Sequence, residues 1–101
     1  MATNTTVLFR GAATTTVGTT LYTVPSGRTT VVSNIAITNT SGSSQTFTLA
    51  LNGTALHTTT TIAANSTAYI DLKQVLVATN TITGGASATS VNFHISGIEV
   101  F

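Results

Sequence analysis

The side chains that could act as acids, bases or nucleophiles are few in this sequence of 101 residues. Hydrolytic catalysis needs a nucleophile, a base and an orienting group within mutual hydrogen-bond reach. The bases available are His57 and His94, the carboxylates are Asp71 and Glu99, and the nucleophiles would be Ser or Thr hydroxyls. No motif joins these residues, and both histidines are typical of ordinary strand positions. We therefore expect no catalytic residue and no enzyme activity.

The same residues do not have the spacing of a metal site or of a glycoside hydrolase. Asp71 and Glu99 would have to be the paired carboxylates of such a hydrolase, and nothing in the sequence around them supports that role. His57, His94 and one carboxylate lack the close ligand spacing of known metal motifs. The sequence contains no Cys, which excludes thiolate ligands, disulfides and a thiol nucleophile. We expect neither a metal nor a cofactor.

Charge is scarce throughout the sequence. Charged residues make up 5% of the chain, against about 25% in an ordinary globular domain. The net charge is +1, and the three dispersed basic residues cannot neutralise the several phosphates that nucleic-acid binding requires. No segment reaches the ~18 apolar residues of a membrane span, and the N-terminus lacks the features of a signal peptide. We expect no nucleic-acid partner and no membrane association.

The composition predicts an all-β fold. The sequence holds 25 Thr and 9 Ser, whereas the strong helix formers Glu, Lys, Arg and Met are nearly missing. Thr and Val are β-branched and favour pleated sheets. The chain is 42% hydrophobic with one Pro, and its mean hydropathy is +0.40, unlike a disordered segment. A folded, single antiparallel β-sandwich or jelly roll of about eight strands follows.

Alternation of apolar and polar residues at period two places the strands. The expected strands lie at 6–10, 19–24, 31–39, 46–51, 54–62, 67–73, 75–77, 81–83 and 91–100. A cluster of small polar residues at 40–44 predicts that 31–39 and 46–51 form a hairpin. The dipeptide Asn52-Gly53 predicts a second hairpin, because a type I′ turn needs positive φ at both central positions.

The last strand contains a change of phase. Its apolar residues are Val91, Phe93 and Ile95, followed after Gly97 by Ile98 and Val100. A β-bulge at Gly97 would shift the inward face by one residue. We therefore predict that Ile98 and Val100 face the core.

The chain divides into a β-sandwich domain at 19–101 and an N-terminal arm or first strand at 1–18. The arm contains the apolar triplet Val7, Leu8 and Phe9, which is long enough for one strand added to a sheet edge. Two alternatives remain open. The triplet forms the first strand of its own sandwich, or it pairs with or lies over a neighbouring subunit or the capsid surface. In the second case Phe9 is buried there and Arg10 reaches an acidic or carbonyl partner.

The low charge predicts a subunit of a permanent assembly. Soluble monomers intersperse charges over their surface to avoid association, whereas the outward strand positions here are Thr, Ser, Asn and Ala. Such short side chains are buried at little cost in desolvation or rotamer entropy. Tyr69 lies on a polar face beside Asp71 and Lys73 and is a candidate contact for a subunit or for a sugar. The candidate subunit contacts are Val7, Leu8, Phe9, Arg10 and Tyr69.

One stretch of the sequence resembles a known group of proteins. It is Leu21-Tyr22-Thr23-Val24-Pro25-Ser26-Gly27-Arg28, followed by the strand at 31–39 and by Thr40-Ser41-Gly42. This resembles the opening of many small virion proteins of tailed bacteriophages, and the resemblance extends over residues 19–101. It implies a β-sandwich protein with a role in capsid decoration, head fibres or tails, and it carries over no catalytic residue. The arm has no counterpart in that pattern.

The resemblance and the composition together predict a capsid decoration protein. We expect a homo-oligomer, with a trimer favoured, that binds the major capsid protein and is located in the virion after assembly in the host cytoplasm. A tail, tail-tip or neck component that binds tail proteins is the alternative within the same class. A carbohydrate-binding module that uses Tyr69 is the alternative from another class, although a chain with no Trp and two Tyr offers few stacking surfaces.

Overall fold

The computed structural model describes residues 2–101, which form eight β-strands and no helix. The strands are β1 (Thr3–Ala12), β2 (Thr20–Thr23), β3 (Thr29–Asn39), β4 (Gln45–Leu51), β5 (Thr54–Ile62), β6 (Ser66–Leu76), β7 (Thr81–Ala86) and β8 (Val91–Val100). The predicted all-β class and the predicted total of about eight strands are confirmed, and of the nine expected ranges the one at 75–77 is not a separate strand.

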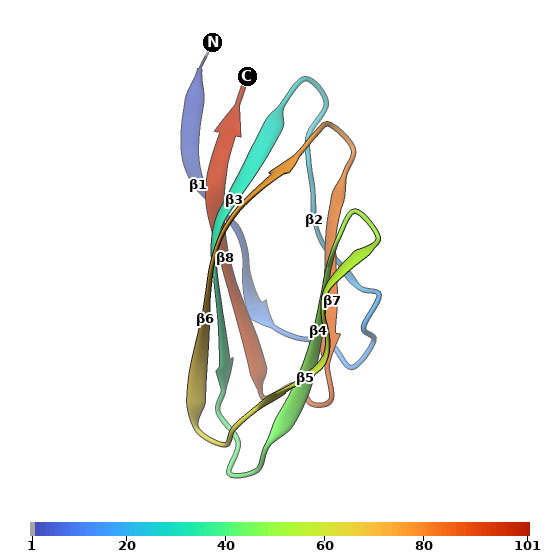
Figure 1. Cartoon of the computed structure of the whole chain (residues 1–101), viewed down its shortest axis with the longest axis vertical. Coiled ribbons are helices and arrows are strands. Elements are labelled where there is room, and N and C mark those ends of the chain that lie inside the picture. Colours follow the sequence, from blue (N-terminus) through green and yellow to red (C-terminus); the bar gives the residue numbers. More distant parts are fainter. Residues whose placement is uncertain (1) are drawn as a thin grey trace.

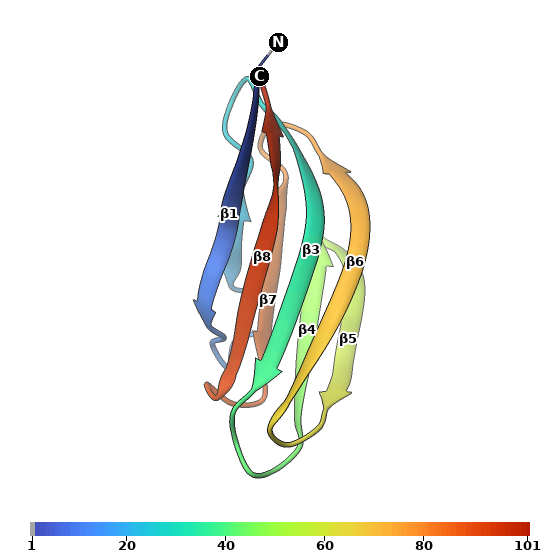
Figure 2. The same cartoon turned by 90° about the vertical axis from the view of Figure 1, so that its left-hand side faces the viewer.

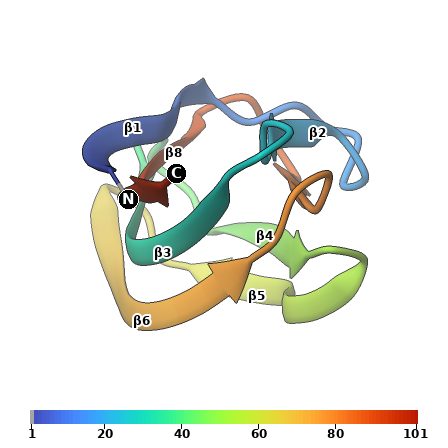
Figure 3. The same cartoon turned by 90° about the horizontal axis from the view of Figure 1, so that it is seen from above.

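The strands form two antiparallel sheets packed face to face (Figure 1). Sheet A has the order β1-β8-β3-β6 and sheet B has the order β2-β7-β4-β5. The first strand pairs with the eighth, the second with the seventh, the third with the sixth and the fourth with the fifth. This is the connectivity of a jelly roll, in which one long antiparallel hairpin is wrapped into two sheets. The view from above separates the two layers (Figure 3).

The first and last strands lie side by side in sheet A, so both ends of the chain emerge at the same end of the sandwich (Figure 2). The Phe101 N–H donates to the carbonyl of Ala2 at 2.8 Å. Thr3–Ala12 therefore forms an edge strand of the chain's own sheet, which is the first of the two alternatives considered for the arm.

The core lies between the sheets and is built from the inward residues of both. In sheet A these include Ile35, Ile37 and Phe93, and in sheet B they include Phe47 and Leu49, all of them buried. Phe47 and Phe93 meet edge to face across the layers, with ring centroids 6.4 Å apart.

The predicted hairpin between 31–39 and 46–51 is wrong, because β3 belongs to sheet A and β4 to sheet B. The connection crosses between the sheets and is held by the fully buried side chain of Asn39. Its amide nitrogen donates to the carbonyls of Ser43 at 2.8 Å, Ala63 at 3.2 Å and Ile62 at 3.3 Å. Its oxygen accepts the N–H of Ser41 at 3.0 Å. Asn39 thus ties the β3–β4 connection to the β5–β6 turn.

The second predicted hairpin is confirmed. Asn52 and Gly53 join β4 to β5 with φ values of 48° and 79°. The separate strand expected at 75–77 is wrong, since β6 continues without a break to Leu76. An irregularity in its pairing with β3, between Asp71 and Gln74, changes the register and lets the strand continue.

The bulge predicted at Gly97 is also wrong. The alternation of β8 runs unbroken from Val91 to Val100, so Gly97 and Glu99 face the core while Ile98 faces outward. The extra residues lie in the two strands that flank β8, at Leu8 in β1 and at Ser33 in β3. The prediction failed because the apolar residues Ile98 and Val100 face outward, whereas Glu99 faces inward and pairs with Arg28.

Candidate functional site

The residues considered for catalysis are dispersed over the sandwich. In sheet B, His57 packs on Phe47 with ring centroids 5.4 Å apart, and its Nδ1 lies 3.3 Å from the Thr60 hydroxyl. His94 and Asp71 lie on the outer face of sheet A, whereas Glu99 points between the sheets. Within residues 2–101, no three His, Asp or Glu residues come together as a possible metal site. The same residues include no helix long and apolar enough to cross a membrane.

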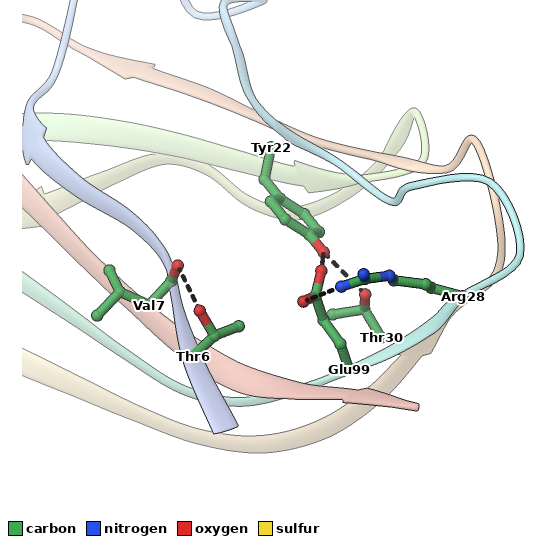
Figure 4. A network of polar contacts seen from close by, with 6 residues as sticks. All are labelled: Thr6, Val7, Tyr22, Arg28, Thr30 and Glu99. Carbon is green, nitrogen blue, oxygen red and sulfur yellow. Dashed lines mark hydrogen bonds and ion pairs between the residues drawn. The ribbon is translucent and has the colours of Figure 1, made fainter. Parts of the chain in front are cut away.

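Glu99 is the centre of a polar network at the end of the sandwich where the chain ends emerge (Figure 4). The Tyr22 hydroxyl donates to its Oε2 at 2.7 Å, and the Arg28 Nη1 donates to its Oε1 at 2.9 Å. Since the Tyr22 proton is committed to Glu99, the Thr30 hydroxyl donates to Tyr22 at 3.0 Å. Arg28 also lies 4.1 Å from the centre of the Phe101 ring. The network joins β2 of sheet B to β3 and β8 of sheet A.

The network changes the pKa of two of its residues, Glu99 and Tyr22. The hydrogen bond from Tyr22 and the neighbouring charge of Arg28 lower the pKa of Glu99, against the opposing effect of its burial. Burial raises the pKa of Tyr22, and its bond to the Glu99 carboxylate acts in the same direction. Glu99 is therefore ionised at neutral pH, buried and paired with Arg28, and removal of its partner would leave an uncompensated buried charge.

The outer face of sheet A carries one row of side chains that crosses all four strands. The register places Arg10 of β1 opposite His94 of β8, His94 opposite Ala36 of β3, and Ala36 opposite Tyr69 of β6. Tyr69 is 73% exposed, as its place on the polar face predicts. We call these four residues the Tyr69 row.

Polar residues border the Tyr69 row on both sides. On one side Asn34 lies opposite Asp71, with the Asn34 amide nitrogen 3.5 Å from the Asp71 carboxylate. On the other side Thr38 lies opposite both Thr67 and Asn92, and the two threonine hydroxyls are 3.3 Å apart. This half of the face therefore offers amide, hydroxyl and carboxylate groups around one exposed aromatic ring.

The other half of the same face is aliphatic. Val31 of β3 lies between Ile98 of β8 and Val75 of β6, and Val100 and Val7 extend the group along β8 and β1. Val75 is 62% exposed and Val7 is 46% exposed, while the other three are half-buried. We call these five residues the aliphatic band. It contains Ile98 and Val100, which sequence reasoning had placed in the core.

Three of the four strands are irregular where the two halves of the face meet. The extra residues Leu8 and Ser33, and the irregularity of β6 beside Lys73, align along one line across the sheet. Two shallow hollows flank Ser33 there, one lined by Asp71 and Lys73 and the other by residues of β1 and β8. Bulges re-aim side chains and are frequent beside binding sites.

The candidate contacts in the arm have different surroundings. Leu8 is buried in the core, and Phe9 is partly buried and packs against the core. The bulge at Leu8 allows these consecutive residues to face inward together. Val7 lies in the aliphatic band and Arg10 ends the Tyr69 row. Of the five candidate contacts, Val7, Arg10 and Tyr69 are thus together on one face, whereas Leu8 and Phe9 pack within the chain.

The outer face of sheet B differs from that of sheet A. Its strands contain no Asp, Glu, Lys or Arg. The outward row at its centre runs through Thr20, Thr83, Ala50 and Ala55. All five charged residues of the chain lie in sheet A or in the turn that leads into β3.

No protein-family model matches the sequence, and a comparison with curated proteins finds none with significant similarity.

Sequence reasoning missed the aliphatic band and the Glu99 network. A signal for the band was present at Val75, which follows Tyr69, Asp71 and Lys73 on the outward face of its strand. Val31 alternates in phase with the inward residues Ile35 and Ile37, and only the extra residue at Ser33 turns it outward. The partners of Glu99 come from positions 22 and 28, far away in the sequence, and only the jelly-roll connectivity brings them to it.

Proposed function

We propose that this chain is a structural subunit of a bacteriophage virion, most specifically a capsid decoration protein. In this proposal it forms a homo-oligomer, with a trimer favoured, binds the major capsid protein and is not an enzyme. The observation that carries the proposal is the aliphatic band, a group of β-branched side chains on an outer sheet face. Contiguous exposed apolar groups on a small soluble domain mark a surface that is covered in the working assembly.

The size of the band favours an assembly of many copies over an isolated tight pair. Full burial of a valine or isoleucine contributes about 1.5–3 kcal/mol, and these five residues are already partly buried. Covering the band would contribute on the order of 5 kcal/mol, which is comparable to the cost of bringing two molecules together. Repeated attachment on a lattice multiplies such modest affinities.

The rest of the surface is compatible with close packing among neighbours. With net charge +1 and Arg28 paired to Glu99, little charge repulsion opposes the approach of identical copies. Short Thr and Ala side chains on sheet B lose little rotamer entropy when covered. The resemblance of residues 19–101 to small virion proteins of tailed phages is the reason for proposing a phage particle as the assembly.

The test is a cryo-electron microscopy reconstruction of the particle that carries this protein. We expect many copies on the head, each with its aliphatic band covered, and we expect particles stripped of the protein to lose heat and osmotic resistance. A few copies at the tail, tail tip or neck would move the protein to the alternative location within the virion. A particle without the chain, or stripped particles of unchanged resistance, would contradict the decoration role.

A further inference from the structure

We propose that the Tyr69 row is a saccharide-binding site that holds a neutral hexopyranose ring between Tyr69 and His94, above Ala36. This site is separate from the aliphatic band and does not depend on the proposed function. A sugar ring has one apolar face and a rim of hydroxyls, so its recognition requires an exposed aromatic ring beside planar hydrogen-bonding groups. The outer face of sheet A brings these groups together at one level of the sheet.

The spacing of the strands gives the site its width. Tyr69 and His94 stand on β6 and β8, which flank β3, so their strands are two inter-strand spacings apart, or roughly 10 Å. Ala36 between them has only a methyl group. The register therefore places two aromatic side chains on either side of a small one, and we call the position between them the slot.

The groups around the slot are suited to sugar hydroxyls. Asn34 and Asp71 stand on one side, with an amide that donates and a carboxylate that accepts. Thr38 and Asn92 stand on the other side, and Arg10 closes the β1 end of the row. None of the side-chain hydrogen bonds and ion pairs between residues 2 and 101 involves Arg10, Tyr69 or His94, so these groups remain available to a ligand.

The same surroundings argue against a protein partner at Tyr69. An aromatic hot spot in a protein interface sits at the centre of a well-packed, desolvated patch. The neighbours of Tyr69 are instead Ala36, Asn34 and Thr38 on β3 and Thr67 and Asp71 on its own strand. The exposed aliphatic residues Val7 and Val75 lie beyond the line of bulges. A sugar uses such a polar border directly, because each polar group can exchange its water for a hydroxyl.

The experiment is an NMR titration of the isotope-labelled full chain with the methyl glycosides of glucose, galactose, mannose and N-acetylglucosamine. We expect at least one of them to bind with a dissociation constant on the order of 1 mM, as suits a shallow site. The shifted amide signals should centre on Ala36, Tyr69 and His94. Spectra of each variant, compared with the wild type before sugar is added, show whether it is folded.

Four variants test the assignment. Tyr69→Ala should weaken binding by about tenfold or more, whereas Tyr69→Phe should retain most of it. Ala36→Leu should block the slot while leaving every polar group in place. Val75→Ala, which trims an exposed residue of the same strand outside the row, is the control and should bind as the wild type does.

Three results would overturn the proposal. The first is the absence of any shift with all four sugars. The second is binding that survives both Tyr69→Ala and Ala36→Leu in folded protein. The third is a set of shifts at Tyr69 that depends on protein concentration alone, which would assign the row to contact between copies of the chain. A failure of the decoration role would leave sugar binding by the isolated chain unchanged, so the two proposals are tested independently.

Discussion

The two sheets of this jelly roll are alike on their inner faces and different on their outer faces. Both contribute large aliphatic and aromatic residues to one core, as Phe93 does in sheet A and Phe47 in sheet B. Outside, sheet B presents mainly Thr and Ala, whereas sheet A carries the Tyr69 row, the aliphatic band and every exposed full charge within its strands.

The difference separates the inward residues, which form the core, from the outward residues, which are available for contacts with other molecules. The inward residues need only be apolar and of suitable size, and each sheet meets that condition without a charge except at Glu99. The outward residues of sheet B are mainly short, uncharged Thr and Ala side chains. We therefore place the specific contacts of the protein on sheet A, where outward residues depart from the Thr-rich background.

The largest expected effect concerns the residue that links the two sheets. Asn39→Ala should lower the free energy of unfolding by about 3 kcal/mol, because it leaves the N–H of Ser41 and several enclosed carbonyls without their partner. Asn34→Ala, on the outer side of the same strand, should cost less than about 0.5 kcal/mol. Urea unfolding of both variants measures the difference. An equal decrease in the free energy of unfolding would show that Asn39 does not link the two connections.

The next effect concerns the line of bulges that crosses sheet A. A Cβ added at Gly97 would collide with the carbonyl of Val31 and would lie 3.0 Å from the Leu8 side chain. Gly97→Ala should therefore cost about 2 kcal/mol through overpacking. Gly42→Ala, where the space is open and φ is not positive, is the control and should be nearly neutral. Thermal unfolding of the two variants measures the difference. Equal melting temperatures would show that the strands around Gly97 adapt to the added Cβ.

A smaller effect depends on pH and concerns Glu99. Its pKa lies below the ordinary value of 4.5, so as the pH falls the unfolded chain takes up a proton before the folded chain does. The stabilisation from Glu99 is complete above that value and is lost as the pH falls toward the folded pKa. Glu99→Gln should cost about 1–2 kcal/mol at neutral pH and should show a weaker acid dependence.

Tyr22→Phe provides a graded comparison for that measurement, because it removes the first of the interactions that lower the pKa of Glu99. Its acid dependence should lie between those of the wild type and Glu99→Gln. The readout is the free energy of unfolding between pH 3 and 7, in roughly unit steps. Parallel curves for all three proteins would show that Glu99 is not linked to the stability of the fold.

The sequence was sufficient to predict the class of the fold and much of its local structure. The composition and the Asn52-Gly53 turn are local signals, and both are confirmed. Period-two alternation located most of the strands but was wrong at 75–77 and after Gly97. The pairing of β3 with β6 and β8, rather than with β4, depends on Asn39 and on contacts between distant segments. Local patterns do not contain that information.

The surface of sheet A was predicted only in part for the same reason. Tyr69 was singled out by its place in an alternating strand, and its exposure is confirmed. Its neighbours in the row come from three other strands and follow only from the register. Ile98 and Val100 were assigned to the wrong face because the sequence does not show that Glu99 points inward. Its inward direction follows only from its pairing with Arg28, which is distant in the sequence.

Sedimentation equilibrium of the purified chain and three variants tests the central claim that sheet A provides the assembly surface. At high protein concentration the wild type should self-associate weakly, with a trimer as the expected species, because covering the band only about balances the cost of association. Val75→Lys should shift it toward monomer because a charge enters the aliphatic band. Val17→Lys, which alters another exposed valine that lies outside both sheets, should associate as the wild type does, and so should Thr61→Lys on the strand at the edge of sheet B. A wild type that remains monomeric at every concentration, or association abolished by Thr61→Lys and unaffected by Val75→Lys, would contradict this account.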